Sequence, residues 1–323
     1  MRRPNPNNVK RVTCVGTGTI GGGFVAQFLA SGYNVTAYNP RKNARDCLER
    51  LLDQAWPLLE QIGLRPGASR GRLRFTQDLE EAVSGAEFVQ ESVPEDLELK
   101  VQTYKQLDEL LPNDIVIGSS TAGFPMTDIQ KRCRFPERTV VTHPVNPPYL
   151  IPLVEVVGGE KTDLAVLDWT AAFFQAAGKR VLRMEKEVFG FVINRLQSAL
   201  FREALHMIAA DQATVTQIDE CITHALGLRW ACMGPFATFH LGGGDGGLGA
   251  FMDMVGKVEW RAPYVTEGPL PDWTPALRER ILQQAQEVID GRTIPQMIEE
   301  RNHTILGLLK LREESRIKAS KQS

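Results

Sequence analysis

Short runs of β-branched and other apolar residues alternate with segments of helical periodicity between residues 10 and 158. The runs that predict strands lie at 10–15, 34–38, 72–75, 88–92, 115–117, 139–142 and 153–157. Helices are predicted at 24–30 and 47–59, and Pro57 is expected to kink the second helix or divide it. Strands that alternate with helices are typical of α/β proteins with a doubly wound parallel sheet.

The periodicity changes near residues 186–190. Beyond this point apolar residues recur at helical spacing over 191–209, 215–226 and 275–288, and a last helix near 297–316 is charged on one face. A glycine cluster at 242–247 interrupts this part of the chain. We therefore predict two domains: residues 1–188, which contain the sheet, and residues 189–323, which are mostly α-helical.

The composition is that of an ordinary soluble globular protein and excludes several classes of function. Of the 323 residues 43% are hydrophobic and 24% charged, and the net charge is −2, so neither nucleic acid nor an anionic membrane is an expected partner. The five cysteines lack the spacing of metal ligands, so we expect free thiols and no metal. The basic N-terminus has no apolar segment behind it and no apolar run approaches a membrane span. A cytoplasmic protein is therefore expected.

A glycine-rich turn follows the first predicted strand. Gly16, Gly18 and Gly21 form the pattern G-x-G-x-x-G at the start of a helix. The first glycine of this pattern permits a tight turn, the second lets backbone approach a pyrophosphate, and the third allows close packing of helix and strand. Thr19 and Ile20 would place free N–H groups of the helix N-terminus beside the phosphates. This context favours a Rossmann-type dinucleotide site over a purely structural turn.

The end of the second predicted strand bears on the choice between NAD and NADP. NAD-selective folds carry Asp or Glu there to hold the ribose 2′-hydroxyl, whereas this chain has Asn39 followed by Arg41 and Lys42. The amide does not repel a 2′-phosphate, and the two cations would attract one. Charge therefore slightly favours NADP. In the alternative, Asn39 still binds the hydroxyl and both cations are solvated loop residues.

One histidine and one carboxylate flank a proline-rich turn. His143 lies at the end of a predicted strand, where an open α/β sheet presents its ligand crevice, and Glu155 lies inside the next apolar run. A histidine held by a buried carboxylate is a general base of fixed tautomer, although a lone histidine can also be structural. Asn194, near the first turn of a helix, would bind a substrate oxygen or simply cap that helix.

The chain resembles the 3-hydroxyacyl-CoA dehydrogenase superfamily over nearly its whole length. The motifs that carry the resemblance are Gly16-x-Gly18-x-x-Gly21, Ser92-Val-Pro94-Glu95 with Lys100, Gly118-Ser-Ser120-Thr121, His143-Pro-Val-Asn146-Pro, Leu153-Val-Glu155-Val, Gly190-Phe-Val-Ile-Asn194-Arg and Met233-Gly-Pro-Phe236. Within the superfamily, the segment 227–235 is most similar to L-carnitine dehydrogenases. The L-gulonate 3-dehydrogenase and lambda-crystallin branch is a near neighbour.

The resemblance implies a metal-free oxidation of an alcohol. His143 would take the proton of the C3 hydroxyl while a hydride passes to the nicotinamide, Glu155 would orient the imidazole, and Asn194 would bind the reacting oxygen. Pro94, Glu95 and Lys100 would bind the cofactor near the nicotinamide-side ribose. The helical second half would close the cleft and form a homodimer.

Two positions depart from the family pattern. Relatives carry a serine directly after the threonine of Gly118-Ser-Ser120-Thr121, and this chain has Ala122. Losing a buried hydroxyl contact costs about 1 to 3 kcal/mol, so activity would be lower or the substrate different unless Ser120 or Thr121 compensates. The second departure is Asn39, where relatives carry an acid.

The residues that would choose the substrate are less sharply defined. A trimethylammonium group prefers aromatic faces, and the candidates are Trp230, Phe236, Phe239 and Trp260, although aromatics at helical spacing are more often core residues. Arg229 would hold a carboxylate or form an ordinary salt bridge. L-carnitine is the leading substrate. The alternatives are L-gulonate, a 3-hydroxyacyl-CoA, a 3-oxo compound reduced with NADPH, and a non-catalytic dinucleotide-binding paralogue.

Overall fold

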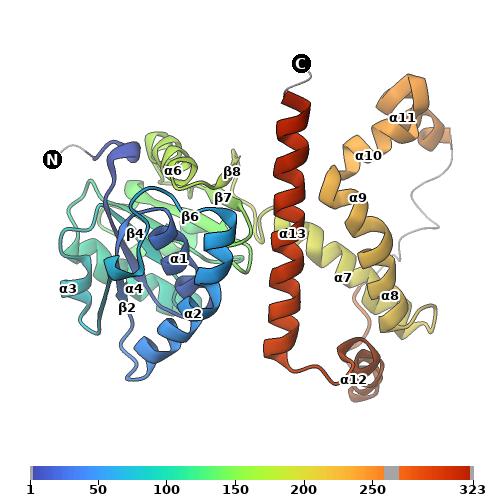
Figure 1. Cartoon of the computed structure of the whole chain (residues 1–323), viewed down its shortest axis with the longest axis horizontal. Coiled ribbons are helices and arrows are strands. Elements are labelled where there is room, and N and C mark those ends of the chain that lie inside the picture. Colours follow the sequence, from blue (N-terminus) through green and yellow to red (C-terminus); the bar gives the residue numbers. More distant parts are fainter. Residues whose placement is uncertain (1–2, 258–268, 321–323) are drawn as a thin grey trace. The chain divides into compact units, whose positions relative to one another are not determined.

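The computed structural model describes residues 3–257 and 269–320 (Figure 1). The chain divides between Asn194 and Arg195 into two compact units. The first unit, blue to green in Figure 1, contains the sheet, and the second, yellow to red, is built from helices.

Within the described residues eight strands form one sheet in the order β3-β2-β1-β4-β5-β6-β7-β8. The strands are β1 (Arg11–Val15), β2 (Asn34–Tyr38), β3 (Leu73–Thr76), β4 (Phe88–Glu91), β5 (Val116–Ser119), β6 (Thr139–Pro144), β7 (Leu153–Val157) and β8 (Arg180–Met184). β1 to β6 run parallel, β7 pairs antiparallel with β6, and β8 pairs parallel with β7. The predicted doubly wound sheet is therefore confirmed, with a reversed pair of strands added at one edge.

The helices of the first unit alternate with these strands. They are η1 (Pro6–Asn8), α1 (Thr19–Ala30), α2 (Ala44–Ile62), η2 (Arg70–Arg72), α3 (Leu79–Val83), α4 (Leu97–Leu110), α5 (Met126–Ile129), η3 (Gln130–Arg132), η4 (Pro136–Arg138) and α6 (Leu164–Ala176). α2 continues through Pro57 as one helix, so the helix is not divided there. Pro57 lies on the exposed side of α2 together with Asp53, whose carbonyl would otherwise accept its N–H. Leucines on both sides of Pro57 keep the helix on the core.

Apolar side chains fill both faces of the sheet. Phe88 of β4 packs against Phe28 of α1 and Phe173 of α6, with ring centroids 6.4 and 4.4 Å apart. The next residue, Val89, points to the opposite face and joins a cluster that includes Tyr104 of α4. Burial on both faces explains why these strands read as nearly continuous apolar runs.

The second unit is helical throughout its described residues, as the periodicity predicted. Its elements are α7 (Ile193–Ala209), which begins just before the division, then α8 (Val215–Cys221), the π-helix η5 (Ile222–Leu226), α9 (Gly227–Cys232), α10 (Pro235–Gly242), η6 (Gly244–Gly246), α11 (Gly247–Lys257), α12 (Pro275–Ile289) and α13 (Ile294–Ser320). The glycine cluster forms the turn between α10 and α11. Among the helices of the described residues, none is both long and apolar enough to cross a membrane.

Candidate functional site

A cavity of about 600 Å³ opens at the carboxyl ends of the central strands. Its wall comes from the turn after β1, the end of β2, the loop after β4 and the first residues after β5, together with residues of α3 and α4. The chain leaves β1 toward β2 on one side and returns to β4 on the other, so the cavity lies where the strand order reverses. Open α/β sheets bind their ligands at this position.

The glycine turn has the geometry that a dinucleotide requires. Gly16 has a φ of 93°, and a Cβ there would lie 2.5 Å from the Ser92 carbonyl oxygen. A Cβ on Gly21 would lie 2.0 Å from the carbonyl oxygen of Gly16, whereas one on Gly18 would meet nothing within 4 Å. Gly18 also lines the cavity, so its missing side chain leaves room for a ligand rather than for protein. The residues present therefore fit a pyrophosphate at the N-terminus of α1.

The predicted cofactor residues lie mostly in this cavity. Those that line it are Gly16, Gly18, Thr19, Ile20, Asn39, Arg41, Pro94 and Glu95. Asn39 donates from Nδ2 to Thr17 Oγ1 at 3.0 Å and accepts the Arg41 N–H at 3.1 Å. Gly21 lies behind the turn, and Lys42 is exposed and is not among the lining residues.

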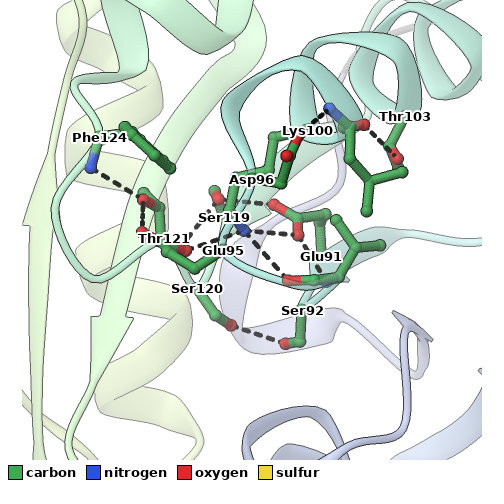
Figure 2. Close-up of polar contacts among 12 residues, drawn as sticks. Glu91, Ser92, Glu95, Asp96, Lys100, Thr103, Ser119, Ser120, Thr121 and Phe124 are labelled. Carbon is green, nitrogen blue, oxygen red and sulfur yellow. Dashed lines mark hydrogen bonds and ion pairs between the residues drawn. The ribbon is translucent and has the colours of Figure 1, made fainter.

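Lys100 lies behind the cavity wall rather than in it. Its Nζ is buried between two carboxylates, 3.0 Å from Glu91 Oε1 and 3.4 Å from Glu95 Oε2 (Figure 2). Glu91 was not among the residues predicted from the sequence, although a carboxylate inside the predicted strand 88–92 was a detectable signal.

His143 and Glu155 contact each other across β6 and β7. The two residues are paired in the antiparallel register, and Glu155 Oε2 lies 2.6 Å from His143 Nδ1. The other oxygen of Glu155 accepts the N–H groups of Val192 at 2.9 Å and Ile193 at 3.1 Å. Both side chains are buried. Because the carboxylate is an acceptor, the proton of a neutral imidazole is placed on Nδ1, and Nε2 is left to accept a proton.

The remaining candidates of the first unit lie in the loop after β5 or, in the case of Asn194 of α7, contact that loop. Asn194 Nδ2 donates to the carbonyl of Ala122 at 2.6 Å. Ser120 lines the cavity, and its Oγ lies 2.7 Å from Ser92 Oγ. Thr121 is buried and donates its hydroxyl to Glu95 Oε1 at 2.7 Å. β5 pairs in parallel with β6, so this loop and His143 lie at the carboxyl ends of neighbouring strands.

The predicted substrate residues of the second unit lie on α9 and α10. Arg229 lines a second cavity of about 530 Å³ together with apolar residues of both helices. Trp230, Phe236 and Phe239 are not among its lining residues. Phe239 stacks on Phe251 with ring centroids 4.7 Å apart, and Phe236 is exposed. Trp260 lies outside the described residues.

Two models of one protein family match the chain over most of its length. Residues 11–188 match the family model "3-hydroxyacyl-CoA dehydrogenase, NAD binding domain", and residues 190–270 match "3-hydroxyacyl-CoA dehydrogenase, C-terminal domain". The chain belongs to the 3-hydroxyacyl-CoA dehydrogenase family. Membership in this family makes the chain an oxidoreductase that acts on a CH–OH group. The match to an NAD-binding domain supports NAD, one of the two cofactors predicted, and the slight preference for NADP stays a prediction.

Relatives and solved structures agree with this membership. The chain is 52% identical to an L-carnitine dehydrogenase of Streptomyces griseus subsp. griseus over 94% of this chain and 90% of that protein. It is 50% identical to an L-carnitine dehydrogenase of Streptomyces coelicolor over 95% and 96% of the two chains. Among solved structures, 5-formyl-3-hydroxy-2-methylpyridine 4-carboxylic acid 5-dehydrogenase, described as an NAD⁺-dependent dismutase, matches with a TM-score of 0.81. That match has 28% identity and covers 94% of this chain and 99% of the other.

Proposed function

We propose that the protein oxidises L-carnitine to 3-dehydrocarnitine. The His143–Glu155 pair, at the carboxyl end of β6, carries the chemical part of this proposal because it leaves a proton acceptor of fixed tautomer. Relatives named L-carnitine dehydrogenase, 52% and 50% identical over nearly the whole chain, support the substrate.

In the proposed reaction the chain supplies the base and the groups that hold the alcohol. His143 Nε2 accepts the hydroxyl proton as the C–O bond becomes a carbonyl, and Glu155 stabilises the imidazolium that forms. When bound, NAD supplies the acceptor for the hydride that leaves the same carbon. Asn194 Nδ2 carries two N–H donors, one of which is used by Ala122 O. The other is available for the reacting oxygen, together with the hydroxyl of Ser120.

We propose residues 1–188 as the cofactor domain, with NADP accepted beside NAD. The turn Gly16–Gly21 would hold the pyrophosphate, and Pro94 and Glu95 would form the nicotinamide-side ribose site. Lys100, which was predicted to bind there directly, lies behind the cavity wall and would instead position Glu95. Asn39 in place of a carboxylate and a lining Arg41 support a place for a 2′-phosphate. Replacing Arg41 by Ala is expected to lower kcat/KM for NADP about tenfold, the value of one charge-assisted contact, and to leave that for NAD unchanged. An equal fall of kcat/KM for both cofactors would show that Arg41 does not recognise the 2′-phosphate.

We propose that residues 189–323 bind the substrate and form a homodimer. Leu196, Leu200 and Phe201 of α7 are 62%, 45% and 63% exposed, and their spacing places them on one side of the helix. Light scattering after size-exclusion chromatography is expected to give twice the mass of the chain, and a Leu196→Glu/Phe201→Glu variant to give a monomer. A monomeric wild-type protein would contradict the proposal.

The deciding experiment follows nicotinamide absorbance with purified protein and L-carnitine, with NAD and NADP in parallel. L-gulonate and a 3-hydroxyacyl-CoA serve as comparison substrates, and His143→Ala is the control for the chemistry. Turnover of L-carnitine that is abolished in His143→Ala supports the proposal. If only L-gulonate or only the acyl-CoA is oxidised, that compound replaces L-carnitine as the substrate. Full activity of His143→Ala would overturn the role of the histidine.

A further inference from the structure

A fully buried carboxylate ends β4 just behind the wall of the nucleotide cavity. Both Glu91 and its partner Lys100 are at most 1% exposed (Figure 2). An isolated charge at such a depth is strongly disfavoured, so an ionised carboxylate requires partners on both of its oxygens. Glu91 Oε1 accepts from Lys100 Nζ at 3.0 Å and from the N–H of Val93 at 2.7 Å, and Oε2 accepts from Ser119 Oγ at 2.6 Å.

Lys100 connects Glu91 with the cavity wall. Its ammonium has three donors, and three acceptors surround it: Glu91 Oε1, the Val93 carbonyl at 3.3 Å and Glu95 Oε2 at 3.4 Å. Two of these oxygens accept hydrogen bonds from Nζ and the third forms an ion pair with it, so the position of the Lys100 head group is set by its surroundings. Two carboxylates share one ammonium, and Glu95 is the more exposed of the two.

Glu95 faces the nucleotide cavity and also holds the loop after β5. Its Oε1 accepts from Thr121 Oγ1 at 2.7 Å and from the N–H groups of Ala122 at 2.8 Å and Gly123 at 3.2 Å. The carbonyl of Ala122 in turn accepts Asn194 Nδ2. A single carboxylate therefore touches both the cofactor cavity and the loop that holds a proposed substrate-binding amide.

A second route leads from Glu91 to the same loop. Ser119, whose hydroxyl donates to Glu91, accepts the N–H of Thr121 at 3.1 Å. Glu91 thus reaches the residues after β5 through Ser119 on one side and through Lys100 and Glu95 on the other (Figure 2).

We propose that Glu91 is a positioning residue that aligns the nicotinamide half of the cofactor cavity with the loop Thr121–Gly123. It does so by fixing Lys100, which sets the carboxylate of Glu95, and by holding Ser119. The inference rests on the proposed cofactor site. It does not depend on the identity of the alcohol.

The test compares NAD with ADP, which occupies only the adenosine half of such a site. Glu91→Gln keeps the shape of the side chain, removes its charge and turns one acceptor into a donor. Dissociation constants are measured by calorimetry without any alcohol. The dissociation constant of NAD is expected to rise about tenfold, while that of ADP stays within a factor of about two.

Two control variants separate positioning from a general loss of stability. Asp108→Asn breaks another buried ion pair of the same unit, that with Arg138 at 2.7 Å, and is expected to lower the melting temperature without changing the ratio of the two dissociation constants. Glu98→Gln removes an exposed carboxylate of α4 that pairs with Arg132 and is expected to change neither property.

Ser119→Ala keeps the test decisive if Glu91→Gln does not fold. It removes one donor to Glu91 and leaves the ion pair intact, so a smaller rise of about threefold is expected for NAD, again without a change for ADP. An unchanged NAD constant, or equal losses for NAD and ADP, would overturn the proposal for Glu91. Failure to oxidise L-carnitine with normal NAD binding would instead count against the proposed substrate.

Discussion

Glu155 lies directly opposite His143 in the antiparallel pair of β6 and β7, and its Oε2 is 2.6 Å from Nδ1 of the imidazole. Paired residues of an antiparallel ladder project to the same side of the sheet, so the strand register itself brings base and carboxylate together. The other oxygen of Glu155 accepts two backbone N–H groups at the entry to α7. The carboxylate is therefore held from two sides and keeps the imidazole in one orientation.

Replacing Glu155 by Gln is expected to lower kcat by about 10³- to 10⁴-fold. The amide can present its N–H₂ group to Nδ1, which favours the tautomer with the proton on Nε2 and removes the proton acceptor. The dissociation constant of NAD is expected to be unchanged, because Glu155 is not among the described residues that line the nucleotide cavity. Steady-state kinetics and calorimetry measure the two quantities. Exposed Glu185→Gln is the control, and a kcat within a few-fold of wild type in Glu155→Gln would contradict the assigned role.

Two substitutions in the glycine turn are expected to have different effects: Gly18→Ala weakens cofactor binding, and Gly21→Ala lowers the stability of the fold. Gly18→Ala adds a Cβ that meets no protein atom within 4 Å, so the melting temperature is expected to stay constant. NAD binding is expected to weaken at least about tenfold, because the added methyl group prevents the close approach of backbone and pyrophosphate. In Gly21→Ala the Cβ would lie 2.0 Å from the carbonyl oxygen of Gly16, and the free energy of unfolding is expected to fall by about 1 to 3 kcal/mol. Thermal denaturation and calorimetry of both variants check the contrast. Equal effects of the two variants on binding and on stability would be incompatible with it.

Much of the sheet could be predicted from the sequence because its strands are buried on both faces. Residues 153–157 coincide with β7, which is buried along almost its whole length. Residues 34–38 coincide with β2, in which buried residues alternate with more exposed ones, the other pattern that predicts a strand. β8 was not predicted, since two arginines interrupt its pattern, as is common at the edge of a sheet.

The site was predictable only where local sequence determines geometry. The roles of Gly16, Gly18 and Gly21 follow from one turn, whereas the burial of Lys100 depends on the packing of α4 on β4, which no motif specifies. The proline-rich turn between His143 and Glu155 indicated that the chain reverses there, but the sequence does not specify the register of the two strands. The structure shows that this register pairs the two residues. The side chains of Arg229 and Trp230 are placed by contacts between helices, and their proposed roles in substrate binding stay predictions.

Lys179 is expected to give the first unit a pH-dependent stability. Its ammonium is buried and donates to the backbone carbonyls of Pro148 and Ile151, and burial lowers the pKa of Lys179 to about 7. In the unfolded chain the lysine keeps its ordinary pKa, so between the two values the unfolded state binds more protons. The free energy of unfolding therefore rises with pH in this interval.

The comparison of wild type with Lys179→Met isolates this contribution. From pH 7 to 8.5 the unfolding free energy of the wild type is expected to rise by about 1.5 kcal/mol relative to the variant, as measured by urea denaturation. Burial also raises the pKa values of the Cys14 and Cys133 thiols, which lowers stability as unfolded thiols ionise near pH 9. Both proteins share these thiols, so their effect cancels in the difference. A difference that is constant with pH would show that Lys179 does not lose its proton in this range.

Ala122 is the position where a single substitution should raise activity. Its backbone is held on both sides, by Glu95 through the N–H and by Asn194 through the carbonyl, while the residue lines the cavity and is exposed. A serine there adds a hydroxyl without burying it against protein, so the melting temperature is expected to stay constant. If the substrate hydroxyl lies beside this loop, Ala122→Ser gains about 1 kcal/mol or more in the transition state and raises kcat/KM about five- to tenfold.

Ala122→Val, which adds bulk without a donor, is the matched control and is expected to lower kcat/KM. A serine variant that behaves like the valine variant would place the reacting hydroxyl away from residue 122 and leave Ser120 and Asn194 as its proposed partners.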